Sequence, residues 1–154
     1  MIETLRFVLA GLGLTQALLM LVDEGIFHHR RGLEKFERWG HVADTSLFFL
    51  AISIPAIFDP SLVTTSIYGL LAVASCLLIT KDEWIHAEAC APLEHWCHAM
   101  LFILHGALLT VIGVLWNLPT DGVLWELKAM PVAVFLWGLY QHFYWNVYQV
   151  RSSH

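Results

Sequence analysis

The sequence of 154 residues is poor in charged residues and in cysteine, and it has no large basic region. Only 14% of its residues are charged and 58% are hydrophobic, whereas a soluble domain is about 25% charged. The net charge of −5 gives no basis for binding nucleic acid. Cys76, Cys90 and Cys97 form no CxxC pair, so we expect reduced thiols rather than a disulfide framework. The composition favours a membrane protein.

Five apolar stretches are each about long enough to cross the ~30 Å hydrocarbon core of a bilayer as a helix. We therefore predict an all-α, polytopic membrane protein that forms one domain over residues 1–154. The first stretch is interpreted as a mature helix, because no small-residue cleavage site follows it. The unbroken apolar character of the later stretches disfavours the alternative, a soluble helical bundle. The transmembrane helices are expected at about 5–22, 42–58, 62–80, 96–116 and 130–148, the last within an extra helix of about 129–150.

The cations are distributed unevenly between the two sides that five spans define. The positive-inside rule places the side with more Lys and Arg in the cytoplasm. We expect an integral protein of a bacterial inner membrane, with the N-terminus outside and the C-terminus cytoplasmic. The cytoplasmic side would carry Arg30, Arg31, Lys35, Arg38, Lys81 and Arg151, and the other side only Arg6 and Lys128.

The two polar loops on the cytoplasmic side share an order of residue types. The first contains DEGIFH at 23–28 and ERWGH at 37–41, and the second contains DEWIH at 82–86 and EHWCH at 94–98. Each has Asp-Glu, an Ile, a His and then Glu-x-Trp-x-His. This order predicts an internal repeat.

The predicted repeat consists of two helical hairpins in parallel orientation, related by a pseudo-twofold axis along the membrane normal. The first copy covers about residues 5–58 and the second about 62–117. We expect their four spans to form a four-helix bundle, with the fifth helix outside the repeat.

Carboxylates and histidines recur at helical spacing where these spans begin and end. Residues three or four apart share one face of a helix, so antiparallel packing would bring four Glu and four His to one level near the cytoplasmic face. Charged groups at that depth are paired or bound to a metal. The predicted metal ligands are Glu24, His28, Glu37, His41, Glu83, His86, Glu94 and His98, and Asp44, His105 and His142 are candidates for supporting or additional ligands.

This donor set suits iron, manganese or zinc, and eight ligands would suffice for two ions. The Glu-x-x-His spacing of Glu83 and His86 resembles that of the di-iron carboxylate proteins of the ferritin-like class, which are four-helix bundles. The other pairs, such as Glu94 and His98, are spaced Glu-x-x-x-His. The resemblance is therefore one of ligand pattern, and it implies two iron ions as cofactors.

The sequence leaves several functions open. The first is a membrane oxidoreductase with a non-haem di-iron site, whose partners would be membrane lipid and a hydrophobic small-molecule substrate or quinone. The second is a b-type haem protein that uses His105 and His142 as axial ligands. A metal transporter or sensor and a zinc hydrolase complete the alternatives.

Overall fold

The computed structural model describes residues 1–82, 90–119 and 124–152, and every regular element in these ranges is helical. The all-α prediction is therefore confirmed. Two of the segments, η1 and η3, are π-helical. The elements are α1 (Ile2–Val22), η1 (Asp23–His28), α2 (His29–Arg31), α3 (Lys35–Ile57), α4 (Leu62–Leu78), the 3₁₀ segment η2 (Ile79–Asp82), α6 (Pro92–Asn117), α7 (Trp125–Phe143), η3 (Tyr144–Tyr148) and α8 (Gln149–Ser152).

Four helices are long and apolar enough to cross a membrane, namely Ile2–Arg31, Lys35–Ile57, Leu62–Lys81 and Pro92–Asn117. The predicted fifth span at 130–148 is helical, within α7 and η3. It is not one of these four helices, because polar residues interrupt its apolar character. The count of five spans is therefore not confirmed.

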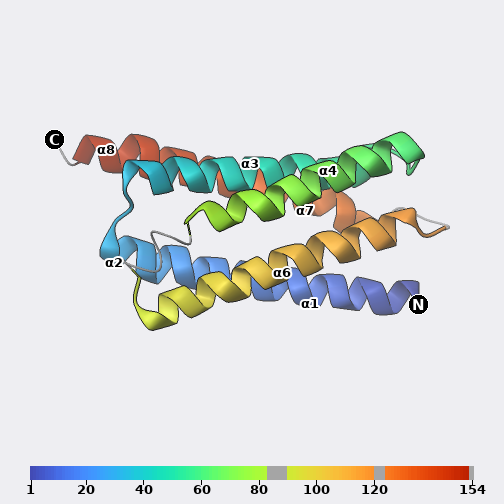
Figure 1. The fold of residues 1–154 in the computed structure, drawn as a ribbon, viewed down its shortest axis with the longest axis horizontal. Helices are drawn as coiled ribbons and strands as arrows, with labels where there is room; N and C mark the ends of the chain where they lie inside the picture. The colour runs from blue at the N-terminus through green and yellow to red at the C-terminus, as the bar shows by residue number, and fades with distance from the viewer. Residues whose placement is uncertain (83–89, 120–123, 153–154) are drawn as a thin grey trace.

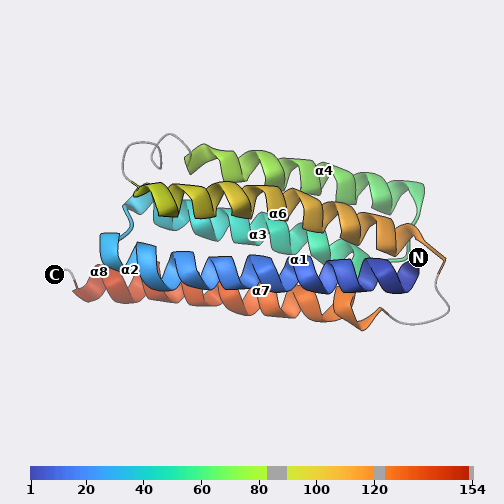
Figure 2. The same ribbon diagram turned by 90° about the horizontal axis from the view of Figure 1, so that it is seen from below.

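The five long helices lie side by side along the length of the molecule, with the two termini at opposite ends (Figures 1 and 2). Helices α1, α4 and α7 run in one direction, and α3 and α6 run in the other. Helix α3 packs against α4 and α7, whereas α1 packs mainly against α6. The internal repeat stays a prediction, because most of the DEWIH segment lies outside the described residues.

The local sequence determines where helices α3 and α6 begin. Gly32 has a φ of 78°, a conformation that glycine adopts readily, and it turns the chain between α2 and α3. Glu34 then caps α3, with its backbone N–H donating to Glu37 Oε2 at 3.0 Å. Helix α6 begins at Pro92, which is favourable in the first turn. Each helix therefore presents a glutamate, Glu37 or Glu94, in its first turn.

The apolar core lies toward the opposite end of the bundle from these helix starts and includes a close approach of α4 to α6. A Cβ atom on Gly113 would lie 2.8 Å from Cε1 of Tyr68. The Tyr68 ring cannot move away freely, because the residue is buried and its hydroxyl donates to the Leu109 carbonyl at 2.5 Å. Only glycine fits this contact.

We expect Gly113→Ala to lower the free energy of unfolding in detergent by about 1–3 kcal/mol, the usual range for overpacking. Gly69→Ala is the matched control, because no atom lies within 4 Å of a Cβ atom there. Thermal unfolding of both variants measures the difference. Equal stability of the two would show that α4 and α6 are farther apart than the structure places them.

Candidate metal centre

A buried cluster of two carboxylates and two imidazoles lies where η1 meets the start of α6. Asp23, His28, Glu94 and His98 each offer one ligand atom, and these atoms all lie within 4.8 Å of one another. Their exposed fractions are 5%, 1%, 3% and 9%. Three of the four, His28, Glu94 and His98, were predicted as ligands from the sequence. The structure adds Asp23.

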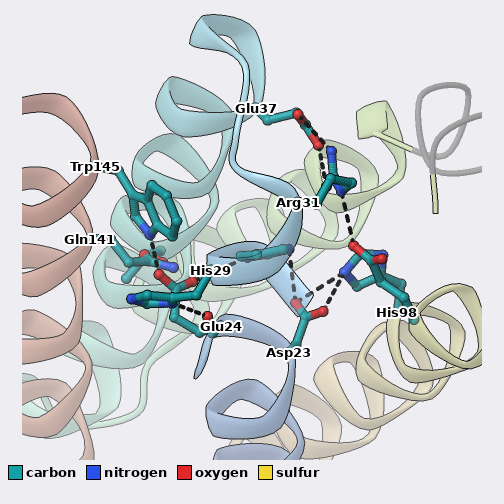
Figure 3. A network of polar contacts seen from close by, with 11 residues as sticks. Asp23, Glu24, His29, Arg31, Glu37, His98, Gln141 and Trp145 are labelled. Carbon is teal, nitrogen blue, oxygen red and sulfur yellow. Dashed lines mark hydrogen bonds and ion pairs between the residues drawn. The ribbon is translucent and has the colours of Figure 1, made fainter. Parts of the chain in front are cut away.

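Asp23 lies between the two histidines of the cluster. His98 Nε2 is 3.0 Å from Oδ2 of Asp23, and His28 Nε2 is 3.3 Å from the same oxygen. On its other side, His28 Nδ1 lies 3.3 Å from Glu24 Oε2. Figure 3 shows Asp23 pointing toward His98 from the neighbouring helix. One carboxylate therefore brings two imidazole nitrogens to a common point.

The π-helical form of η1 explains why Asp23 and His28 meet. In an α-helix, residues five apart differ by about 140° around the axis. In a π-helix the hydrogen bonds run from i to i+5, which brings residues five apart onto nearly the same face. Only Glu24, four residues before His28, would share its face if the segment were α-helical. Single π-helical turns occur frequently at functional sites.

Glu37 has a different partner from the one its spacing predicted. Its carboxylate accepts two hydrogen bonds from Arg31, at 2.7 and 3.1 Å, and the residue is 0% exposed. Arg31 Nε also donates to Glu94 Oε1 at 3.2 Å. The guanidinium therefore links Glu37 to the cluster without placing it among the four ligand atoms (Figure 3). The sequence interpretation explained Arg31 by membrane topology and anionic lipid, and it missed this role.

Glu24 and His41, two further predicted ligands, lie beside the cluster. The indole N–H of Trp145, which is buried in η3, donates to Glu24 Oε1. The His41 ring lies 4.8 Å from that of His28, centroid to centroid. The two π-helical segments thus meet at the bond between Glu24 and Trp145. Nothing in the sequence pattern pointed to that bond.

The remaining predicted residues are distributed around the bundle. Glu83 and His86 lie outside the described residues, and Asp44 forms an ion pair with Lys81 of η2. His105 is buried, with Nε2 at 2.8 Å from Ser75 Oγ. The His142 ring lies against Trp39 at 5.7 Å. The two histidines of the proposed haem pair therefore face different neighbours.

Four buried carboxylates lie close together in this region of the described chain. Asp23, Glu24, Glu37 and Glu94 are all at most 5% exposed. Arg31 forms ion pairs with Glu37 and Glu94, and Asp23 and Glu24 lie 3.0–3.3 Å from histidine nitrogens. Buried charges in proteins are paired or coordinate a metal, so these carboxylates are candidates for holding a divalent ion.

The four ligand atoms of the cluster do not include a thiol. Burial, followed by the hydrogen bond to Glu94, raises the pKa of the Cys90 thiol to about 12. The donors present are imidazole nitrogen and carboxylate oxygen, a set that suits iron, manganese and zinc.

Three of the four cluster residues line one end of a partly open cavity of about 550 Å³ between the helices. The walls come from α1, α3, α6 and α7, and the lining is mostly apolar. Asp23, His28 and His98 line the cavity near one end of the molecule, and Glu126, at the start of α7, lines it near the other. Small-molecule sites have this volume and this mixture of apolar wall and few polar groups.

Comparisons with known proteins give no match from which a function could be inferred. No protein-family model, curated protein or solved structure matches the chain significantly. The resemblance to di-iron carboxylate proteins accordingly remains one of ligand pattern.

Proposed function

We propose that the protein is an integral membrane metalloprotein that holds non-haem iron and oxidises or reduces a lipid-soluble substrate. The observation that carries the proposal is the buried cluster of Asp23, His28, Glu94 and His98, of which Asp23, His28 and His98 line one end of a mostly apolar cavity. A metal site beside a space of this size can act on a molecule that enters it.

The donor set supports iron as the metal. Two imidazoles with one or two carboxylates are the ligands of non-haem Fe(II) sites that activate oxygen. Asp23, His28, Glu94 and His98 would hold the ion, and Arg31 would orient Glu94 through its 3.2 Å hydrogen bond. Bound iron supplies one-electron redox chemistry and a position for oxygen.

A second ion is part of the proposal, as predicted from the sequence. Glu24 and His41 lie next to His28 and would provide ligands on that side. Glu83 and His86 would complete a dinuclear site. Zinc and manganese accept the same donors, and the metal analysis below distinguishes them from iron.

The proposed topology has five spans, with the metal centre near the cytoplasmic face. The termini lie at opposite ends of the bundle (Figure 1), as an odd number of crossings requires. Helix α7 would be the fifth span, with its polar residues turned toward the cavity, where Gln141 is found. The excess of Lys and Arg near the metal end supports a cytoplasmic location.

Elemental analysis of protein purified in detergent tests the proposal. Wild-type protein should contain iron, at one to two equivalents, and Glu94→Gln should lose most of it. Glu126→Gln is the matched control, because this carboxylate lines the same cavity at its far end and its loss should leave the iron content unchanged. Oxygen uptake by the reduced protein with a long-chain quinol as the electron donor, absent in Glu94→Gln, tests the redox function. Folded protein without metal would refute the proposal.

A further inference from the structure

We infer that the cavity binds an elongated apolar molecule carrying one hydroxyl group, and that Gln16 and Trp137 bind that hydroxyl. The inference deepens the proposed function by naming its substrate class, a long-chain or isoprenoid alcohol. It stands on polar groups inside the cavity that are separate from the metal cluster.

The cavity-lining residues with a buried polar atom that lacks a hydrogen bond include two outside the metal cluster and apart from the carboxylates, Gln16 and Trp137. Gln16 is 7% exposed, and its Oε1 atom has no hydrogen-bond donor within reach. The indole Nε1 of Trp137 is likewise buried and without an acceptor. Both residues line the cavity. Because a buried polar group without a hydrogen bond is destabilising, this pair indicates a bound partner.

The geometry of the two helices places these atoms at one level. Helices α1 and α7 run in the same direction (Figure 2). They are joined at one end by the hydrogen bond from Arg6 to Glu126, at 2.5 Å, and at the other by the bond from Trp145 to Glu24. Gln16 and Trp137 each lie eight residues before Glu24 and Trp145, respectively. With an equal rise per residue, Gln16 and Trp137 lie at about the same level along the bundle.

A hydroxyl group satisfies both atoms at once. It donates to the Gln16 oxygen and accepts from the Trp137 N–H, whereas an ether oxygen can only accept and an alkane can do neither. A single water would also form both bonds, but it would leave the rest of a mostly apolar cavity empty. The hydrocarbon part of an alcohol would fill that space.

The level of this hydroxyl site determines which part of the ligand faces the metal. Asp23 follows Gln16 by seven residues and Trp145 follows Trp137 by eight, which corresponds to roughly 10–12 Å along the helices. The metal cluster would therefore face carbon atoms remote from the hydroxyl. The substrate would react along its chain and not at its alcohol carbon.

Binding of three probes with the same chain tests the inference. Hexadecan-1-ol, its methyl ether and hexadecane differ only in their polar end. Apparent dissociation constants come from the dependence of the unfolding temperature on probe concentration in detergent. Wild-type protein should bind the alcohol roughly 10-fold more tightly than hexadecane, the value for one to two hydrogen bonds, and the ether should fall between them.

Gln16→Leu and Trp137→Phe should each lower the ratio of alcohol to alkane affinity, because each variant removes one of the two hydrogen bonds to the hydroxyl. Trp125→Phe is the matched control, since Trp125 is 71% exposed and should keep the wild-type ratio. Gln16→Leu removes an unsatisfied buried group, so without ligand it should be at least as stable as wild type. Equal affinity of the wild type for alcohol and alkane, or an unchanged ratio in Gln16→Leu, would overturn the inference.

Metal content measured on the same samples separates the two proposals. Gln16→Leu should keep its iron while its preference for alcohol is reduced. Preference for alcohol in a protein without metal would support the hydroxyl site and refute the metalloprotein. Metal in a protein that shows no preference for alcohol would refute the hydroxyl site and leave the metalloprotein proposal standing.

Discussion

Asp23→Asn protein should fold and lose its metal, with an affinity at least roughly 100-fold lower than wild type, whereas Glu37→Gln should keep metal. Asp23 is within 3.0–3.3 Å of both histidines of the cluster, and an amide cannot replace its charge. Glu37 is bonded instead to Arg31. Loss of an outer partner of a ligand typically lowers metal affinity by about 10- to 100-fold, and loss of a ligand should exceed that range.

The contrast between these two carboxylates is the sharpest test of the ligand set, because spacing on an α-helix predicts the opposite order. Titration of metal-stripped protein with Fe(II) under anaerobic conditions gives both affinities. Circular dichroism of the same samples establishes that each variant is helical. If Asp23→Asn still binds metal and Glu37→Gln does not, Glu37 is a ligand and Asp23 is not.

Arg31→Met should be the most destabilising single substitution near the site. It leaves Glu37, which is 0% exposed, without the guanidinium that donates two hydrogen bonds to it. Removing one partner of a buried ion pair lowers the free energy of unfolding by about 3–5 kcal/mol. The unfolding temperature should fall by roughly 10 °C, measured in detergent.

Two further variants identify the cause of this loss. Arg30→Met changes the adjacent, exposed arginine and should leave the unfolding temperature nearly unchanged. The double variant Arg31→Met with Glu37→Gln removes both charges and should recover much of the lost stability, since the penalty comes from an unpaired buried charge. Equal stability of the single and double variants would show that Arg31 acts through packing.

Two of the three predicted ligands that the structure brings into the cluster lie on a continuous α-helix, and the third, His28, lies in the π-helical η1. Glu94 and His98 are four apart near the start of α6, where the spacing rule for helices holds, and both belong to the cluster. Asp23 belongs to the same Asp-Glu segment that suggested the repeat. It was not predicted as a ligand, because a π-helical turn cannot be recognised from apolar periodicity.

The partners of Glu24 and Glu37 could not be predicted from local spacing. Trp145 lies 121 residues away from Glu24 along the chain, and only the packing of η3 against η1 brings them together. Arg31 reaches Glu37 because the chain turns back at Gly32. A cation between charged loop residues is equally typical of a membrane boundary, so sequence alone does not distinguish the two roles.

The helical fold could be predicted from the composition more directly than the candidate site could. Long apolar runs require helices in a bilayer, and the four most apolar ones are present. Helix α7 is less apolar because one of its faces lines the cavity, where Gln141 accepts a hydrogen bond from Thr45 at 2.6 Å. Polar residues of α7 lower its mean hydropathy, and one of them, Gln141, is buried in the bundle.

The parallel arrangement of α1 and α7 also bears on how the protein is made. The first of the long helices leaves the ribosome well before the last, since domains emerge from the N-terminus. Until α7 is synthesised, Glu24 lacks its indole donor and the cavity lacks one of its four walls. An ion taken up by the incomplete chain would be open to lipid on that side. Completion of the proposed centre therefore depends on the packing of α7 against the earlier helices.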